Sequence, residues 1–192
     1  MNLVRNMHRE AELAVALANL ARPGDARGRA YQPARGDDLA MQFSGCLSNA
    51  WATQLRAVDD AGARLAGLAD ALHPVFISDS ASQTVALLND LLQQFRAQPY
   101  LTDDVDQPFH LHFHGDRRGT PVEALASELV FALALVVDAY GTDRFGVCVA
   151  RVCDRVYVDL TRNGSRRYCS DACGARTKMA AHRARRLAAP GT

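Results

Sequence analysis

The sequence predicts a mainly α-helical N-terminal domain with one small β-hairpin (α+β), followed by a compact C-terminal unit. Apolar residues recur at helical spacing through most of the first 140 positions. The last fifty residues instead contain four of the five cysteines and most of the net positive charge. We therefore place the domain boundary between 143 and 144, which gives domains at 1–143 and 144–192.

The composition is that of an ordinary soluble protein. Hydrophobic residues make up 48% of the 192 positions and charged residues 22%, so disorder is not expected. No apolar run approaches the roughly 20 residues that a membrane span requires. The first residues do not follow the layout of a signal peptide. We expect a cytoplasmic protein with no membrane partner.

The net charge of +1 conceals a division between the two predicted domains. Residues 1–143 contain 11 arginines and 18 acidic residues, a balance of −7. Residues 144–192 contain 10 arginines and one lysine against three aspartates, a balance of +8. An acidic body with a basic C-terminal unit indicates two parts with different partners, although a merely polarised, solvated surface would give the same count.

The N-terminal domain is expected to begin with three helices. An amphipathic helix is predicted at 3–21, and the Gly- and Pro-containing stretch 23–36 is predicted to be an exposed loop. A short helix is predicted at 37–47 and a longer one at 51–72. His73-Pro74 should end the longer helix, because a residue before proline avoids helical geometry.

Two capping boxes predict the starts of the next helices. Ser80 and Gln83 precede an apolar periodic stretch that extends to Phe95. Thr120 and Glu123 flank Pro121 at the first helical position, and the helix 121–140 is so apolar that it should be buried at the centre.

Between these helices, 99–102 and 108–114 are predicted to form two strands. His110, His112 and His114 alternate with apolar residues along the second strand. Three imidazoles on one strand face could form a second metal or ligand site. They span about 13 Å, so outside ligands would be needed, and a solvated strand face is the simpler interpretation.

Cys148, Cys153, Cys169 and Cys173 form a C-x4-C pair and a C-x3-C pair separated by fifteen residues. Two close pairs of soft ligands suit tetrahedral Zn²⁺, and a reducing compartment disfavours the alternative of two disulfides. Residues 155–159 and 165–168 should pair as a hairpin through an Asn163-Gly164 turn. A basic helix is predicted at 174–186. Knuckle, hairpin and helix together predict a treble-clef-like zinc finger.

The stretch Thr161-Arg162-Asn163-Gly164-Ser165-Arg166-Arg167-Tyr168-Cys169-Ser170 resembles the CGNR zinc finger, a C-terminal unit of bacterial proteins regarded as transcription regulators. The family's C-G-N-R signature is altered here to Cys173-Gly174-Ala175-Arg176, in which Ala175 replaces the usual Asn. The preceding helices with their hairpin resemble the ABATE domain over roughly 9–140. That domain usually precedes this finger and is thought to sense a signal. The usual Asn-Thr of that domain is here Asn19-Leu20.

Several basic or polar residues of the finger are candidates for contacts with double-stranded DNA. Guanidinium forks suit phosphate oxygens and guanine edges. The candidates are Arg162, Asn163, Arg166, Arg167, Arg176, Lys178, Arg183 and Arg186. The alternative is a zinc-stabilised interaction module whose arginines dock on an acidic partner.

The resemblance and the charge division together predict a zinc-dependent DNA-binding transcription regulator. The N-terminal domain would sense a small-molecule or protein effector or mediate dimerisation. We expect a homodimer, because one finger offers a small contact surface. No catalytic motif is found, and a four-cysteine zinc has no open coordination position, so we do not expect an enzyme.

Overall fold

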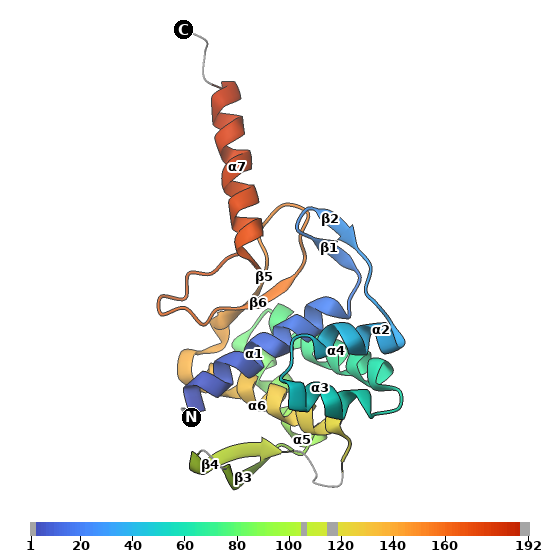
Figure 1. The fold of residues 1–192 in the computed structure, drawn as a ribbon. Helices are drawn as coiled ribbons and strands as arrows, with labels where there is room; N and C mark the ends of the chain where they lie inside the picture. Colours follow the sequence, from blue (N-terminus) through green and yellow to red (C-terminus); the bar gives the residue numbers. More distant parts are fainter. Residues whose placement is uncertain (1–2, 105–106, 115–118, 189–192) are drawn as a thin grey trace.

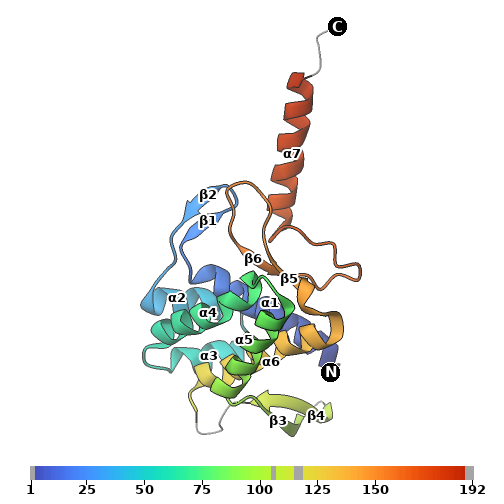
Figure 2. The ribbon, with the colours of Figure 1, turned by 180° about the vertical axis from the view of Figure 1, so that it is seen from behind.

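A computed structural model describes residues 3–104, 107–114 and 119–188. Within these residues the chain forms a body of packed helices from which one C-terminal helix projects (Figure 1). The view from behind shows the same helix standing clear of the body (Figure 2). None of the helices described is long and apolar enough to cross a membrane.

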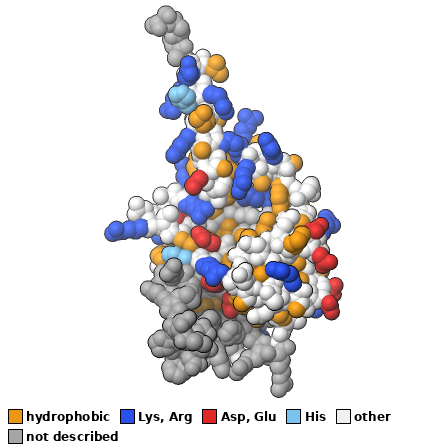
Figure 3. Space-filling model, in the orientation of Figure 1, with side chains coloured by type: hydrophobic (Ala, Val, Ile, Leu, Met, Phe, Trp, Pro, Cys, Tyr) orange, Lys and Arg blue, Asp and Glu red, His pale blue; other side chains and the backbone are white. Residues whose placement is uncertain are grey.

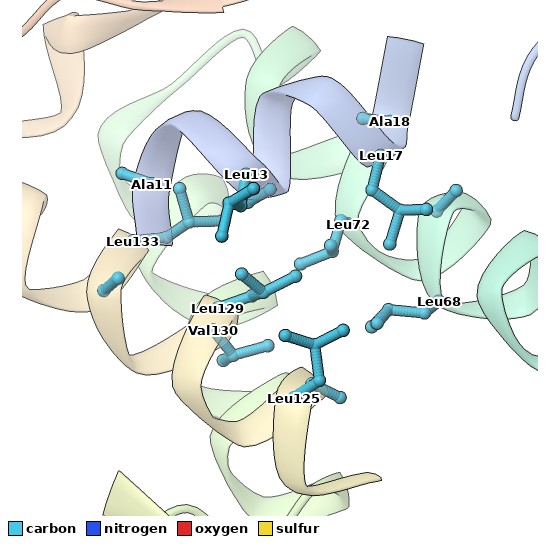
Figure 4. Close-up of a cluster of buried hydrophobic side chains, with 14 of the residues drawn as sticks. Ala11, Leu13, Leu17, Ala18, Leu68, Leu72, Leu125, Leu129, Val130 and Leu133 are labelled. Atoms are coloured by element: carbon cyan, nitrogen blue, oxygen red, sulfur yellow. The ribbon is translucent and has the colours of Figure 1, made fainter. Parts of the chain in front are cut away.

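The core of the body lies between α1 (Leu3–Leu20), α4 (Ala61–Ile77) and α6 (Pro121–Tyr140). Leucines and small residues of these three helices meet in one cluster (Figure 4). Leu17, Leu72 and Leu129 are fully buried there. As predicted, α6 is the central helix. Nine of its twenty residues are buried and only three are exposed, because its sequence is apolar on nearly every face.

Two side-chain caps start helices where the sequence predicts them. The Thr120 hydroxyl accepts a hydrogen bond from the Glu123 N–H, while the Glu123 carboxylate accepts one from the Thr120 N–H at 2.7 Å. The Ser80 hydroxyl caps α5 (Ala81–Gln94) by accepting from the Gln83 N–H. Local capping chemistry therefore fixes both boundaries.

The single helix predicted at 51–72 is wrong, because the chain breaks it in two and its second half continues past residue 72. The chain forms α3 (Asn49–Arg56), then a break at Asp60, whose φ of 59° is left-handed, and then α4. Helix α4 continues past Pro74 to Ile77. Proline removes one helical hydrogen bond. Burial of Val75 and Phe76 in the core, at 0% and 2% exposure, offsets that loss.

The prediction that residues 23–36 form an exposed loop is wrong in part. It contains a short hairpin, β1 (Gly24–Ala26) with β2 (Arg29–Tyr31), and then leads into α2 (Gly36–Ser44). The turn Arg27-Gly28 has positive φ at both residues. These strands are only three residues long and have no alternating apolar pattern, so periodicity does not reveal them.

A second antiparallel hairpin joins β3 (Gln98–Asp104) to β4 (Gln107–His114), close to the predicted strands. It lies at the end of the body away from the projecting helix (Figures 1 and 2).

The C-terminal segment differs from the prediction in its strand pairing. Strand β6 (Val156–Val158) pairs with β5 (Phe145–Val147), which precedes the first cysteine pair, and not with 165–168. The predicted Asn163-Gly164 turn has positive φ only at Gly164 and connects no strands. Helix α7 (Asp171–Ala188) then begins three residues earlier than predicted.

Strand β6 also joins the C-terminal segment to the body. Val156 and Val158 are both buried and belong to the same apolar core as α1 and α4. The division into domains at 1–143 and 144–192 stays a prediction, and its two parts meet along β5, β6 and the end of α1.

Candidate metal centre and basic surface

Four cysteine sulfurs converge beneath α7. The Sγ atoms of Cys148, Cys153, Cys169 and Cys173 all lie within 4.8 Å of one another. The knuckle between β5 and β6 supplies the first two. The loop before α7 supplies Cys169, and the first turn of α7 supplies Cys173. Cys148 and Cys173 are buried, and the other two are half-buried.

The spacing of the sulfurs fits a tetrahedral metal ion. Four thiolates about 2.3 Å from a tetrahedral Zn²⁺ lie about 3.8 Å apart. The Sγ atoms are 3.7 Å apart for Cys153–Cys169, 3.8 Å for Cys169–Cys173 and 3.7 Å for Cys173–Cys153. A disulfide would require about 2.05 Å, so these sulfurs are not disulfide-bonded, and their separations fit the ligands of one metal ion. The four cysteines are thus positioned to bind one metal ion.

The environments of the thiols differ. Burial raises the pKa of Cys148 and of Cys169. Burial also acts to raise the pKa of Cys173, but hydrogen bonds from Ser170, Cys153 and Arg176 outweigh it and lower that pKa to about 7. A metal ion must displace the protons that remain, so its binding should strengthen as the pH rises.

Arg166 holds the loop that carries Cys169. Its guanidinium donates hydrogen bonds to the carbonyl oxygens of Tyr168, Val158 and Cys169 at 3.0, 3.2 and 3.0 Å. Its backbone N–H donates to the buried Asp159 carboxylate at 2.6 Å. Arg166 thus supports the metal site, a role that its sequence context does not distinguish from a DNA contact.

Arg176 also lies against the metal site. It is half-buried in the first turns of α7, and its guanidinium helps to lower the pKa of the Cys173 thiol, which favours the thiolate. On its other side, a Cβ atom built on Gly28 in the β1–β2 turn would lie 2.9 Å from its Nη1. Arg176 therefore occupies the junction between the metal site and the body.

Two residues whose structural role the sequence does not reveal fasten this segment to the body. The Asn19 amide accepts from the Val156 N–H at 2.8 Å and donates to the Val156 carbonyl at 2.9 Å. Arg155 is buried, and its guanidinium donates to the Asn19, Arg22 and Pro23 carbonyls at the end of α1. The Asp154 carboxylate balances that charge at 2.6 Å. The three carbonyl acceptors of Arg155 are separated from it by more than 130 positions, so no local pattern could reveal them.

The remaining candidates for DNA contacts are solvent-exposed. Arg162, Asn163 and Arg167 lie on the exposed loop between β6 and α7. Lys178, Arg183 and Arg186 lie on α7, where every residue from 178 to 187 is exposed. Figure 3 shows Lys and Arg side chains gathered along α7 and over its junction with the body. The helix therefore presents an extended basic surface.

His110, His112 and His114 occupy alternate positions of strand β4. Their side chains lie outside the described residues, so a second metal or ligand site there stays a prediction. The four-cysteine cluster is the metal-ligating group found among the side chains that the structure describes.

A short antiparallel hairpin, a helix and four converging thiolates define a zinc-finger type of metal site. Residues 144–186 match the family model of the CGNR zinc finger, which covers both cysteine pairs, the exposed loop and most of α7. No curated protein matches the chain.

Proposed function

We propose that this protein is a zinc-dependent DNA-binding transcription regulator. The supporting observation is α7, a basic helix with solvent around most of its length and its first turn held by a metal-ligating cysteine. A helix of this diameter fits the major groove of B-DNA. Zinc is the metal that four closely spaced cysteines favour.

In this proposal the metal has an indirect part in DNA binding. Within the described residues, α7 packs on the rest of the chain only near its first turns, so its direction depends on Cys173 and the loop before it. Zinc would fix that direction by joining Cys173 to the knuckle. The Arg and Lys side chains of α7 would then contact phosphates and base edges.

The test uses residues that have no part in the metal site. Arg183→Ala/Arg186→Ala should weaken binding of the zinc-loaded chain to duplex DNA by at least about tenfold at low salt, because two cationic contacts are lost. The matched control is Arg56→Ala/Arg64→Ala, which removes two exposed arginines from α3 and α4 of the body. Fluorescence anisotropy with DNA selected from a random pool gives the affinities, and metal analysis confirms one zinc per chain.

Wild-type protein that carries zinc but binds no duplex DNA at low salt would exclude this function. Retention of an acidic protein partner by the same residues would then support the alternative, an interaction module. In this proposal the N-terminal body senses an effector or mediates dimerisation. Sedimentation of the full chain with and without DNA tests the homodimer.

A further inference from the structure

The β1–β2 hairpin brings basic residues of the N-terminal body to the foot of α7. Arg27 occupies its turn and Arg29 begins its second strand, and both side chains are exposed. Neither has an ion pair or a hydrogen bond from its side chain to any other described residue. Although residues 1–143 carry a net negative charge, this edge of the body presents two exposed arginines.

The hairpin is fixed to the metal-binding segment. The Gly28 N–H donates to the Val152 carbonyl in the knuckle at 2.9 Å. The Asp154 N–H donates to the Asp25 carbonyl at 3.0 Å, and the Asp25 N–H donates to the Asp154 carboxylate. These three bonds hold the hairpin beside the knuckle, so Arg27 and Arg29 keep a set position relative to α7.

The hairpin faces the same side of α7 as two of its basic residues. Arg176 lies against Gly28, and Arg183 lies seven residues further on the same helical face, about 10 Å along the axis. The 161–165 loop with Arg162 extends to the opposite side of the foot of α7 (Figures 1 and 2). Cationic side chains thus flank the helix on both sides.

A hollow beside the hairpin leaves room for a ligand. It has a volume of about 640 Å³, and its lining includes Arg27, Arg29, Tyr31 and Ser170. Arg155 also borders it, but hydrogen bonds to the carbonyls of Asn19, Arg22 and Pro23 and to the Asp154 carboxylate occupy that guanidinium. The free cations at its rim are therefore Arg27 and Arg29.

We propose that the β1–β2 hairpin is part of the DNA interface, with Arg27 and Arg29 binding backbone phosphates beside the groove that α7 enters. This inference rests on the proposed function. It assigns the hairpin a positioning contact without base readout, because phosphate contacts fix a protein's orientation on the duplex and carry no direct sequence information. The body would thereby set the orientation of α7 on the duplex.

The experiment measures DNA affinity of the full zinc-loaded chain against salt concentration. Each lost phosphate contact should reduce the slope of log affinity against log salt by about 0.9. Arg27→Ala/Arg29→Ala should therefore lower the slope by about 1.8 and weaken binding roughly 10- to 100-fold near 0.1 M salt. Arg27→Lys/Arg29→Lys should keep most of the slope, and Arg56→Ala/Arg64→Ala should keep all of it.

An unchanged slope in Arg27→Ala/Arg29→Ala, with zinc content and thermal midpoint intact, would overturn the hairpin contact and leave the proposed function standing. Weaker binding with an unchanged slope would overturn it as well, since no phosphate contact would have been removed. Wild-type protein without DNA binding would overturn the proposed function, and the hairpin contact with it.

Discussion

Asn19 shows how one side chain can join distant parts of the chain. Its amide satisfies both backbone groups of Val156, a residue with 0% exposure. Asn19→Ala would leave a buried N–H and a buried C=O without partners, which should lower the free energy of unfolding by about 1–3 kcal/mol. Urea unfolding checks the prediction, and hydrogen exchange at the Val156 amide should accelerate.

The matched control is Asn89→Ala, which removes an exposed amide from α5. Its free energy of unfolding should change by less than about 0.5 kcal/mol. Equal stabilities of the two variants would show that the Asn19 hydrogen bonds do not hold β6 to α1.

Between elements, the packing of α1 and α6 brings two carboxyl groups together. Burial and the nearby Glu10 carboxylate raise the pKa of Glu128 to about 7 from an ordinary 4.5. The folded state thus holds this proton more tightly than the unfolded state, so stability falls as the pH rises from about 5 to 7. This group should reduce the free energy of unfolding by roughly 3 kcal/mol at pH 8 relative to pH 4.

Glu128→Gln should therefore flatten the decline in stability above pH 5, as followed by thermal unfolding at several pH values. Glu12→Gln, which changes an exposed residue of α1, should leave the decline in place. A wild-type pH profile in Glu128→Gln would show that another group produces the decline.

For the whole molecule, the metal site should stabilise the helical body as well as the C-terminal segment. Chelation should melt α7 and also loosen β6, whose Val156 and Val158 lie in the body core. Far-UV circular dichroism should show lost helicity, and the thermal midpoint should fall by about 10 °C or more as several kcal/mol of stability are lost.

Cys169→Ser should reproduce both effects. Cys46→Ser should reproduce neither, because Cys46 is exposed and lies outside the cluster. A body midpoint unchanged by chelation would contradict this coupling.

The sequence predicts those features that depend on short spacing. The cysteine pairs and the caps at Ser80 and Thr120 belong to this group. The β1–β2 hairpin escapes prediction because it is held by hydrogen bonds to a knuckle more than 120 residues away. Arg166 is misleading for another reason. An arginine that binds carbonyl oxygens and one that binds phosphate have the same sequence signature.

The strand β6 has a consequence for how this protein can change over evolutionary time. The segments on either side of it carry the metal-ligating cysteines, while its two valines pack into the core formed by helices α1, α4 and α6. A C-terminal segment exchanged for one from another protein would have to bring valines of matching shape and a backbone in register with Asn19. Recombination that separates α1 from β6 should therefore yield misfolded chimeras, and the two segments should be inherited together.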